Sequence, residues 1–300
     1  MSQFGAYYLT GFMLITAAFS QQCRLQFDAR VPQGTSVGNF DVKTSLFRTT
    51  DVIGKGSDTF YFPHCLRTHV SPGLKFSEVI QLPKSGASLF DEKSTPFEVT
   101  ISDKSIFNDQ VGFRRAEVLP VSVTGDDTDP SSLGIKTLHF SLKSDPLKAL
   151  NTSHEYQLVF MEDSAFSTNQ FVLKTGTILG QKQDPKDLVL MGNVDDGEIL
   201  FTTPFTAGVF HNFALKLNFD DNQISVFYST GNEALKSVLT DTANDLTGHG
   251  MFHFGLLKKP VGEAKDIAKG GFQPDGIDEG IIYGGIFQED SVDGCLSSTV

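Results

Sequence analysis

The segment "HNFALKLNF", residues 211–219, alternates between apolar and polar side chains along its whole length. Successive side chains of a β-strand point to opposite faces of the sheet, so a period of two predicts a strand with one buried face. The buried face would carry the side chains of Phe213, Leu215, Leu217 and Phe219. The opposite face would carry Asn212, Ala214, Lys216 and Asn218. This pattern predicts an amphipathic strand that covers a hydrophobic core.

The same alternation recurs along much of the chain, while long stretches with helical periodicity are nearly absent. Further strands are predicted at residues 136–143, 154–160, 223–229 and 251–257. Turn-forming clusters such as "TGDDTDPSS" (124–132) separate them. Only residues 232–239 and 262–271 have a pattern that permits a short helix. We therefore expect an all-β fold, a single-domain antiparallel jelly roll or sandwich.

Two of these segments carry polar groups opposite their apolar face. In residues 154–160 the predicted buried side chains are Tyr156, Leu158 and Phe160. In residues 251–257 they are Phe252, Phe254 and Leu256, opposite His253. The outer face of one sheet in a sandwich can curve into a groove, and polar side chains there suit a neutral polysaccharide. A solvated sheet face shows the same alternation, so periodicity leaves both interpretations open.

The composition indicates a folded, acidic protein. The chain has 300 residues, of which 39% are hydrophobic and 20% charged, which is enough apolar material for a packed core. Its net charge of −12 argues against a nucleic-acid or anionic-membrane partner, because both require a basic surface. An acidic surface is compatible with a neutral substrate.

The N-terminal segment predicts secretion. Residues 7–20, "YYLTGFMLITAAFS", are apolar and are followed by the polar "QQCR". Ala18 and Ser20 occupy positions −3 and −1 of a cleavage point before Gln21. The run is too short for a comfortable membrane span. We expect a signal peptide over residues 1–20 and a mature, secreted chain over residues 21–300.

The chain has three cysteines, Cys23, Cys65 and Cys295. Because secreted proteins fold in an oxidising environment, we expect a disulfide among them. One disulfide and one free thiol is the simplest arrangement. Cys23 and Cys295 lie near opposite ends of the chain, which often meet in sandwich folds, but Cys65 could pair with either. No Cys/His cluster suggests a metal site. The sequon at Asn151 predicts a glycosylated surface loop.

Carboxylates are the remaining catalytic candidates, because serine-nucleophile, phosphate-loop and zinc-protease motifs are absent from the sequence. Glycoside hydrolysis usually needs two carboxyl groups, one on each side of the bond. Glu98, Glu117 and Glu155 lie on predicted strands, which would fix their positions better than loops would. Arg115 shares a strand face with Glu117. For each glutamate alone, a solvated strand residue is the competing interpretation.

Histidines also occupy strand-like segments: His139, His154, His211 and His253. A histidine in such a position is usually a hydrogen-bonded structural residue. His253 lies opposite the phenylalanines of "MFHFG" and is the one expected to face a groove.

Several segments together resemble one family. The residues from Phe210 to Pro260, followed by "GIDEGIIYGGIFQEDS" (276–291), resemble fungal glycoside hydrolase family 131. The segments "LQFDARVP" (25–32), "GFRRAEVLPV" (112–121) and "HEYQLVFMEDS" (154–164) agree with it. The likeness extends from about Cys23 to Cys295, so the mature chain is identified as one catalytic domain of this family.

The resemblance implies a β-jelly roll with a substrate groove on one sheet and a secreted enzyme that hydrolyses β-1,3, β-1,6 and β-1,4 linkages of β-glucan. It also implies an inverting mechanism without a cofactor and a monomeric protein. The two essential carboxylates map to Glu117 in "RRAEVLP" and Glu155 in "HEYQLV". Arg115 would keep Glu117 ionised, so we expect Glu117 to be the base and Glu155 the acid. The expected substrate contacts are Arg115, Gln157, Lys216, His253 and Lys258.

One departure from the family pattern concerns sugar stacking. The chain has no Trp, and Phe210 precedes His211 where an aromatic-rich "WHNFA" is expected. Phe or Tyr side chains would have to stack on the sugar rings. A non-catalytic β-glucan-binding protein or secreted effector on the same scaffold is the alternative function. A polysaccharide lyase would need a basic site for an anionic substrate, which the acidic composition disfavours.

Overall fold

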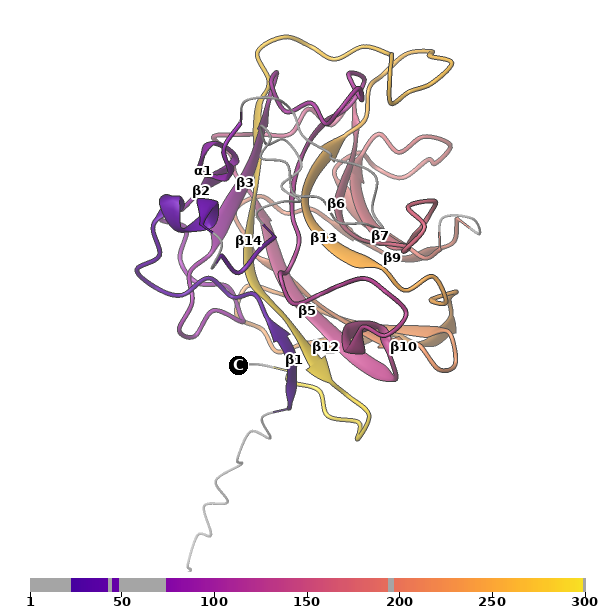
Figure 1. Ribbon diagram of the computed structural model, residues 1–300. Coiled ribbons are helices and arrows are strands. Elements are labelled where there is room, and N and C mark those ends of the chain that lie inside the picture. The colour runs from indigo at the N-terminus through magenta and orange to yellow at the C-terminus, as the bar shows by residue number, and fades with distance from the viewer. Residues whose placement is uncertain (1–22, 43–44, 49–73, 194–196, 299–300) are drawn as a thin grey trace, which may run out of the picture.

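The computed structural model describes residues 23–42, 45–48, 74–193 and 197–298. The predicted signal peptide, residues 1–20, and Cys65 lie outside the described residues. Two antiparallel β-sheets pack face to face, with β3, β5 and β14 in one layer and β6, β7 and β13 in the other (Figure 1). The predicted all-β sandwich is confirmed.

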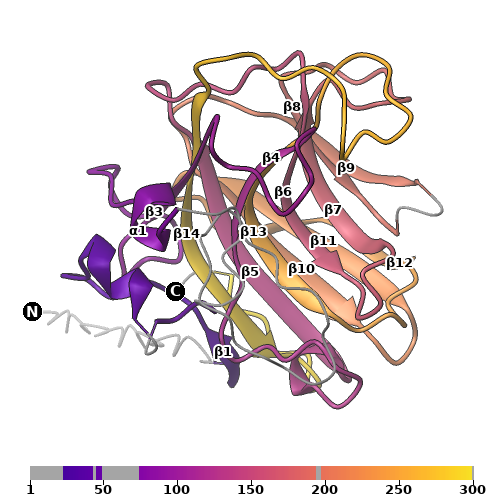
Figure 2. The ribbon, with the colours of Figure 1, turned by 45° about the horizontal axis from the view of Figure 1, so that its top comes forward.

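The larger sheet has the strand order β12-β11-β10-β5-β14-β3-β2, and β1 also pairs with β14. Its long neighbouring strands β5 and β14 are seen in Figure 2. The bounds of its strands are β1 (Leu25–Asp28), β2 (Ile80–Gln81), β3 (Phe97–Ser102), β5 (Ile135–Ser144), β10 (His211–Asn218), β11 (Gln223–Thr230), β12 (Lys236–Ala243) and β14 (Asp278–Asp290).

The smaller sheet has the strand order β4-β13-β6-β7-β8-β9. Its strands are β4 (Arg114–Val118), β6 (Glu155–Glu162), β7 (Asn169–Gly176), β8 (Asp187–Met191), β9 (Ile199–Pro204) and β13 (Met251–Lys258). The short helical elements are α1 (Phe76–Val79) and the 3-10 turns η1 (Val37–Asp41) and η2 (Pro130–Ser132).

Both helices predicted from the sequence are wrong. Residues 262–271 form turns and bends, and residues 236–239 belong to strand β12, which extends to Ala243. The segment "NEALKSVL" has good helix formers, but β12 pairs with the edge of β11 instead. Tertiary pairing has overridden a weak local preference here.

The hydrophobic core lies between the two sheets. The burial of side chains from β10 in this core confirms the alternation predicted for residues 211–217. Phe213, Leu215 and Leu217 are fully buried, and the Phe213 ring stacks 5.3 Å from Phe140 of the neighbouring strand β5. Phe254 of the smaller sheet meets Phe140 edge-on at 6.0 Å from the opposite side. The two apolar faces therefore interlock through aromatic side chains.

Among the register shifts of the smaller sheet are β-bulges in β6 and β13 that the sequence pattern does not reveal. The register of β6 against β7 shifts between Gln157 and Val159, and that of β13 against β6 shifts between Phe254 and Leu257. A bulge reverses the alternation beyond it, so Val159 joins the core and Phe160 turns to the outer face. The predicted burial of Phe160 in the core between the sheets is therefore wrong.

The ends of the described chain are joined covalently. Cys23 and Cys295 form a disulfide, which resolves the pairing that the sequence left open. Within the described ranges, no helix is both long and apolar enough to cross a membrane.

Candidate active site

Four polar side chains meet on the outer face of the smaller sheet. Arg115 and Glu117 come from β4, His253 from β13 and Glu162 from the end of β6. Glu117 is paired in register with Gly255, which places His253 diagonally across from it on the same face. We refer to Arg115, Glu117, Glu162 and His253 as the Glu117 cluster.

The contacts within the Glu117 cluster form a continuous series. The Arg115 guanidinium donates two hydrogen bonds to Glu117, from Nε to Oε1 at 2.8 Å and from Nη2 to Oε2 at 2.7 Å. His253 Nδ1 lies 2.8 Å from Glu117 Oε2, and His253 Nε2 lies 3.4 Å from Glu162 Oε2. One imidazole ring therefore separates two carboxylates.

The cluster is buried at one end and open at the other. The Glu117 side chain is 0% exposed and His253 is 3% exposed, whereas Glu162 is 26% exposed. The ring of Phe160 stacks on His253 at a centroid distance of 4.4 Å, which fixes the plane of the imidazole. Solvent and any ligand therefore approach this cluster from the Glu162 side.

Burial and charged neighbours have opposite effects on the ionisation of Glu117 and His253. Burial disfavours an ionised Glu117, but the Arg115 charge and the hydrogen bond with His253 outweigh it, so the pKa of Glu117 is lowered. Burial also disfavours a charged His253, but the carboxylates of Glu117 and Glu162 outweigh it and raise the pKa of His253. Arg115 and a protonated His253 thus compensate the buried negative charge of Glu117.

Glu155 belongs to a different group, which we call the Glu155 cluster: Glu155, Lys174 and Lys259. Lys174 Nζ and Lys259 Nζ lie 3.0 and 2.7 Å from Glu155 Oε1, and the Leu179 amide donates to Oε2 at 3.0 Å. Burial opposes ionisation, but the two lysines outweigh it and lower the pKa of Glu155. Strand β13 lies between Glu117 on β4 and Glu155 on β6.

A family model of the glycoside hydrolase 131 catalytic N-terminal domain matches residues 25–294. The chain belongs to glycoside hydrolase family 131. The protein is therefore a glycoside hydrolase, as the sequence resemblance predicted. The comparison with curated proteins gives no match.

Two solved structures from family 131 share the fold. The catalytic domain of a GH131 beta-glucanase from Podospora anserina is 19% identical, with a TM-score of 0.66. The catalytic domain of the family 131 protein from Coprinopsis cinerea is 20% identical, with a TM-score of 0.64. Each alignment covers 92% of this chain and 98% of the other. The jelly-roll-like sandwich is thus the fold of family 131.

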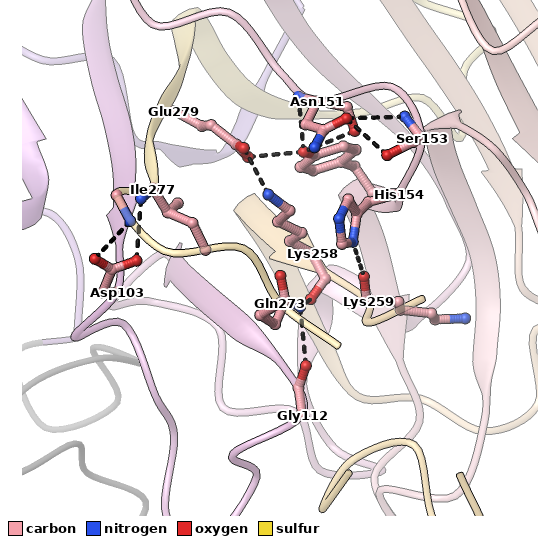
Figure 3. A network of polar contacts seen from close by, with 12 residues as sticks. Asp103, Gly112, Asn151, Ser153, His154, Lys258, Lys259, Gln273, Ile277 and Glu279 are labelled. Atoms are coloured by element: carbon pink, nitrogen blue, oxygen red, sulfur yellow. Dashed lines mark hydrogen bonds and ion pairs between the residues drawn. The ribbon is translucent and has the colours of Figure 1, made fainter. Parts of the chain in front are cut away.

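Two predicted substrate contacts lie elsewhere in this family 131 domain. The Lys258 ammonium points to the Glu279 carboxylate of β14 at the end of the sandwich, at 2.6 Å, and its side chain is 0% exposed (Figure 3). Lys216 lies on the larger sheet and pairs with Asp241 at 2.8 Å. The structure therefore does not bring Lys216 or Lys258 to the Glu117 cluster.

The other predicted groups have local partners. Gln157 Oε1 accepts a long hydrogen bond of 3.4 Å from Asn169, which is the register partner of Glu162 in β7. Among the remaining histidines, His139 contacts Glu289, His154 contacts the Lys259 carbonyl and His211 contacts Tyr228. The exposed Asn151 accepts a hydrogen bond from the Ser153 hydroxyl at 2.7 Å (Figure 3).

Glu98 lies on β3 of the larger sheet, away from the Glu117 cluster. Its side chain is buried, and burial together with the nearby Asp145 carboxylate raises the pKa of Glu98 to about 7. Among the described residues, no group of three or more His, Cys, Asp or Glu could hold a metal ion.

Glu162 is the site residue that the sequence pattern missed. It has the same parity as Phe160, which strict alternation assigns to the core. The bulge in β6 brings both side chains to the outer face. The only signal in the sequence was the acidic end of "HEYQLVFMEDS", directly after the predicted strand.

Proposed function

We propose that the protein is a secreted β-glucan hydrolase that acts as a monomer on β-1,3, β-1,6 and β-1,4 linkages. Membership of family 131 supports hydrolysis, and the Podospora structure of the same fold is that of a beta-glucanase. The signal-peptide pattern of residues 1–20 supports secretion. The net charge of −12 supports a neutral polysaccharide as the partner, rather than nucleic acid or an anionic membrane.

The observation that carries this proposal is the series Glu117–His253–Glu162. Inverting hydrolysis needs two carboxyl groups roughly 6.5–9.5 Å apart, so that a water molecule fits beside the sugar. The imidazole of His253 lies between the two carboxyl groups, so they do not approach each other as closely as a retaining pair does. We therefore propose an inverting reaction in which Glu117 and Glu162 are the two carboxyl groups.

Glu162 is assigned as the proton donor, because it is the most exposed carboxyl group of the cluster. It donates a proton to the glycosidic oxygen as the bond to the anomeric carbon breaks. The carboxylate that remains faces His253, whose raised pKa favours the charged imidazolium that stabilises it. Glu117, kept ionised by Arg115, remains the predicted base of the reaction.

The family resemblance predicts that Glu155 is the proton donor. The contacts of Glu155 favour another role. Two lysines favour the ionised form of Glu155, and its side chain is 2% exposed, whereas that of Glu162 is 26% exposed and open to a substrate. The Glu155 carboxylate also accepts the Leu179 amide, so it anchors the loop that follows β7. We therefore favour Glu162 over Glu155 as the acid.

Three matched substitutions, Glu117→Gln, Glu162→Gln and Glu155→Gln, test these assignments with laminarin and mixed-linkage glucan as substrates. Release of reducing ends should fall about 100- to 10,000-fold for the first two variants, the usual contribution of an acid or base. Glu155→Gln should keep most of the activity. Proton NMR of the first product formed should show the α-anomer.

Each alternative has its own outcome. An inactive Glu155→Gln with an active Glu162→Gln would return the acid role to Glu155. A retained β-anomer would exclude inversion. A wild-type protein that binds laminarin but releases no reducing ends would identify a non-catalytic glucan-binding protein.

A further inference from the structure

A tyrosine from the larger sheet reaches across the core to the backbone beneath the Glu117 cluster. Tyr283 of β14 is fully buried. Its hydroxyl lies 2.8 Å from the carbonyl oxygen of Gly255 in β13 and 2.9 Å from that of Leu158 in β6. One hydroxyl proton is thus shared between two neighbouring strands of the opposite sheet.

These two carbonyls lie at the bulges of β13 and β6 described above. Gly255 is inside the register shift of β13 between Phe254 and Leu257. Leu158 is inside the register shift of β6 between Gln157 and Val159. A bulge disrupts the regular ladder and leaves backbone groups in need of other partners. Tyr283 supplies a donor at both places.

Both bulges control the geometry of the Glu117 cluster. Gly255 is the register partner of Glu117, and the strands approach so closely that a Cβ on Gly255 would clash with the Ala116 carbonyl and lie 2.7 Å from Glu117 Cα. The bulge in β6 turns Phe160 outward, where its ring stacks on His253. A shift of either bulge would therefore move Glu117 relative to His253.

Burial makes the Tyr283 hydroxyl a permanent donor. The pKa of Tyr283 is raised well above its ordinary value, chiefly by burial, so its hydroxyl keeps its proton throughout the working pH range. The phenol makes no contact with substrate, because it lies on the core side of the sheet whose outer face carries the cluster.

We propose that Tyr283 is a positioning residue: it holds the bulged backbone at Gly255 and Leu158, and thereby fixes the hydrogen bond between Glu117 and His253. The part of this proposal that concerns activity rests on the proposed function of the Glu117 cluster. The part that concerns geometry does not, because the hydrogen bond exists whatever the cluster catalyses.

Tyr283→Phe removes the hydroxyl and keeps the ring, and Tyr156→Phe is the matched control. Tyr156 is equally buried and spans the core in the other direction, where its hydroxyl donates to Glu279 at 2.7 Å. Both variants lose a buried hydrogen bond, so a purely structural role predicts similar effects from the two. The measurements are an NMR titration of the His253 ring, assigned with His253→Gln, and kcat and KM on laminarin.

Tyr283→Phe should move the pKa of His253 towards its ordinary value and lower kcat about tenfold or more, with KM changed less than twofold. Tyr156→Phe should leave the His253 titration and kcat within twofold of the wild type. Identical His253 titrations in wild type and Tyr283→Phe would overturn the proposal. Should Tyr283→Phe not fold, Gly255→Ala displaces the same backbone, and an unchanged His253 titration in that variant would overturn the proposal equally.

A failure of the proposed function can be distinguished from a failure of the positioning role of Tyr283. If Glu117→Gln and Glu162→Gln remain fully active, the proposed function fails, and the His253 titration alone decides the role of Tyr283. If those variants are inactive but Tyr283→Phe matches Tyr156→Phe in both titration and kcat, the proposed function stands and the positioning role is excluded.

Discussion

The Glu117 and Glu155 clusters are each built around a buried glutamate, but they differ in their chemistry. Each is built on a glutamate of the smaller sheet with a side chain no more than 2% exposed, and each glutamate has two cationic neighbours and a lowered pKa. Glu155 meets the side-chain nitrogens of two lysines. Glu117 meets an imidazole that contacts a second, exposed carboxylate.

Burial and charged neighbours therefore do not by themselves identify a catalytic carboxylate. Lysine partners make Glu155 a fixed negative charge, suited to anchoring the Leu179 amide. A histidine partner connects Glu117 to a group that can change its protonation near neutral pH. The identity of the neighbouring base therefore decides which glutamate can take part in proton transfer.

The largest expected effect comes from removing one cation from each cluster. Arg115→Met leaves the fully buried Glu117 with only His253 for charge compensation, which should lower the free energy of unfolding by about 3–5 kcal/mol. Lys259→Met leaves Lys174 beside Glu155 and should cost about 1 kcal/mol, because Lys259 is partly exposed. Urea unfolding at pH 6 measures both, and equal losses would contradict the comparison.

Glu98 is a contrasting buried glutamate, because burial and the nearby Asp145 carboxylate raise its pKa. With a pKa of about 7 when folded and 4.5 as its reference, Glu98 binds more protons in the folded state between these values. Stability should therefore fall as the pH rises from 4.5 to 7, by up to about 3 kcal/mol from this group. Glu98→Gln should remove that fall in urea midpoints measured from pH 5 to 8, and an unchanged pH dependence would refute it.

His253 should give a smaller effect of the same sign. Its folded pKa is raised above the ordinary value of 6.5, so its stabilisation is fully present below pH 6.5 and is lost as the pH rises through the folded pKa. The difference in unfolding free energy between wild type and His253→Gln should shrink from pH 5.5 to 8.5, by about 1.4 kcal/mol for each unit of the shift. A difference that grows with pH would contradict the charged imidazole.

Alternation in the sequence predicted the strands and much of the core, because side-chain period follows directly from the pleat. It also placed Arg115 and Glu117 on one face, where the structure has them. Lys258, which was predicted to contact the substrate, is instead buried. The partner that makes its burial possible, Glu279, lies on a distant strand.

The remaining features depend on non-local pairing. Lys216 faces outward as its parity requires, but no local pattern tells which of the two sheets contains β10. Glu162 and Phe160 reach the outer face through a bulge that depends on the neighbouring strand β7. Bulges of this kind carry no fixed sequence signature in these strands, so the composition of the Glu117 cluster became visible only in three dimensions.

The Cys23–Cys295 bridge has a consequence for how stability and catalysis can be separated. It links residues 272 positions apart, so its main effect falls on the entropy of the unfolded chain, which becomes a ring instead of an open polymer. Neither cysteine belongs to the Glu117 cluster. Opening that ring would lower the free energy of the unfolded chain and leave the contacts of Glu117, His253 and Glu162 in place. The folding equilibrium can therefore be varied independently of the chemistry.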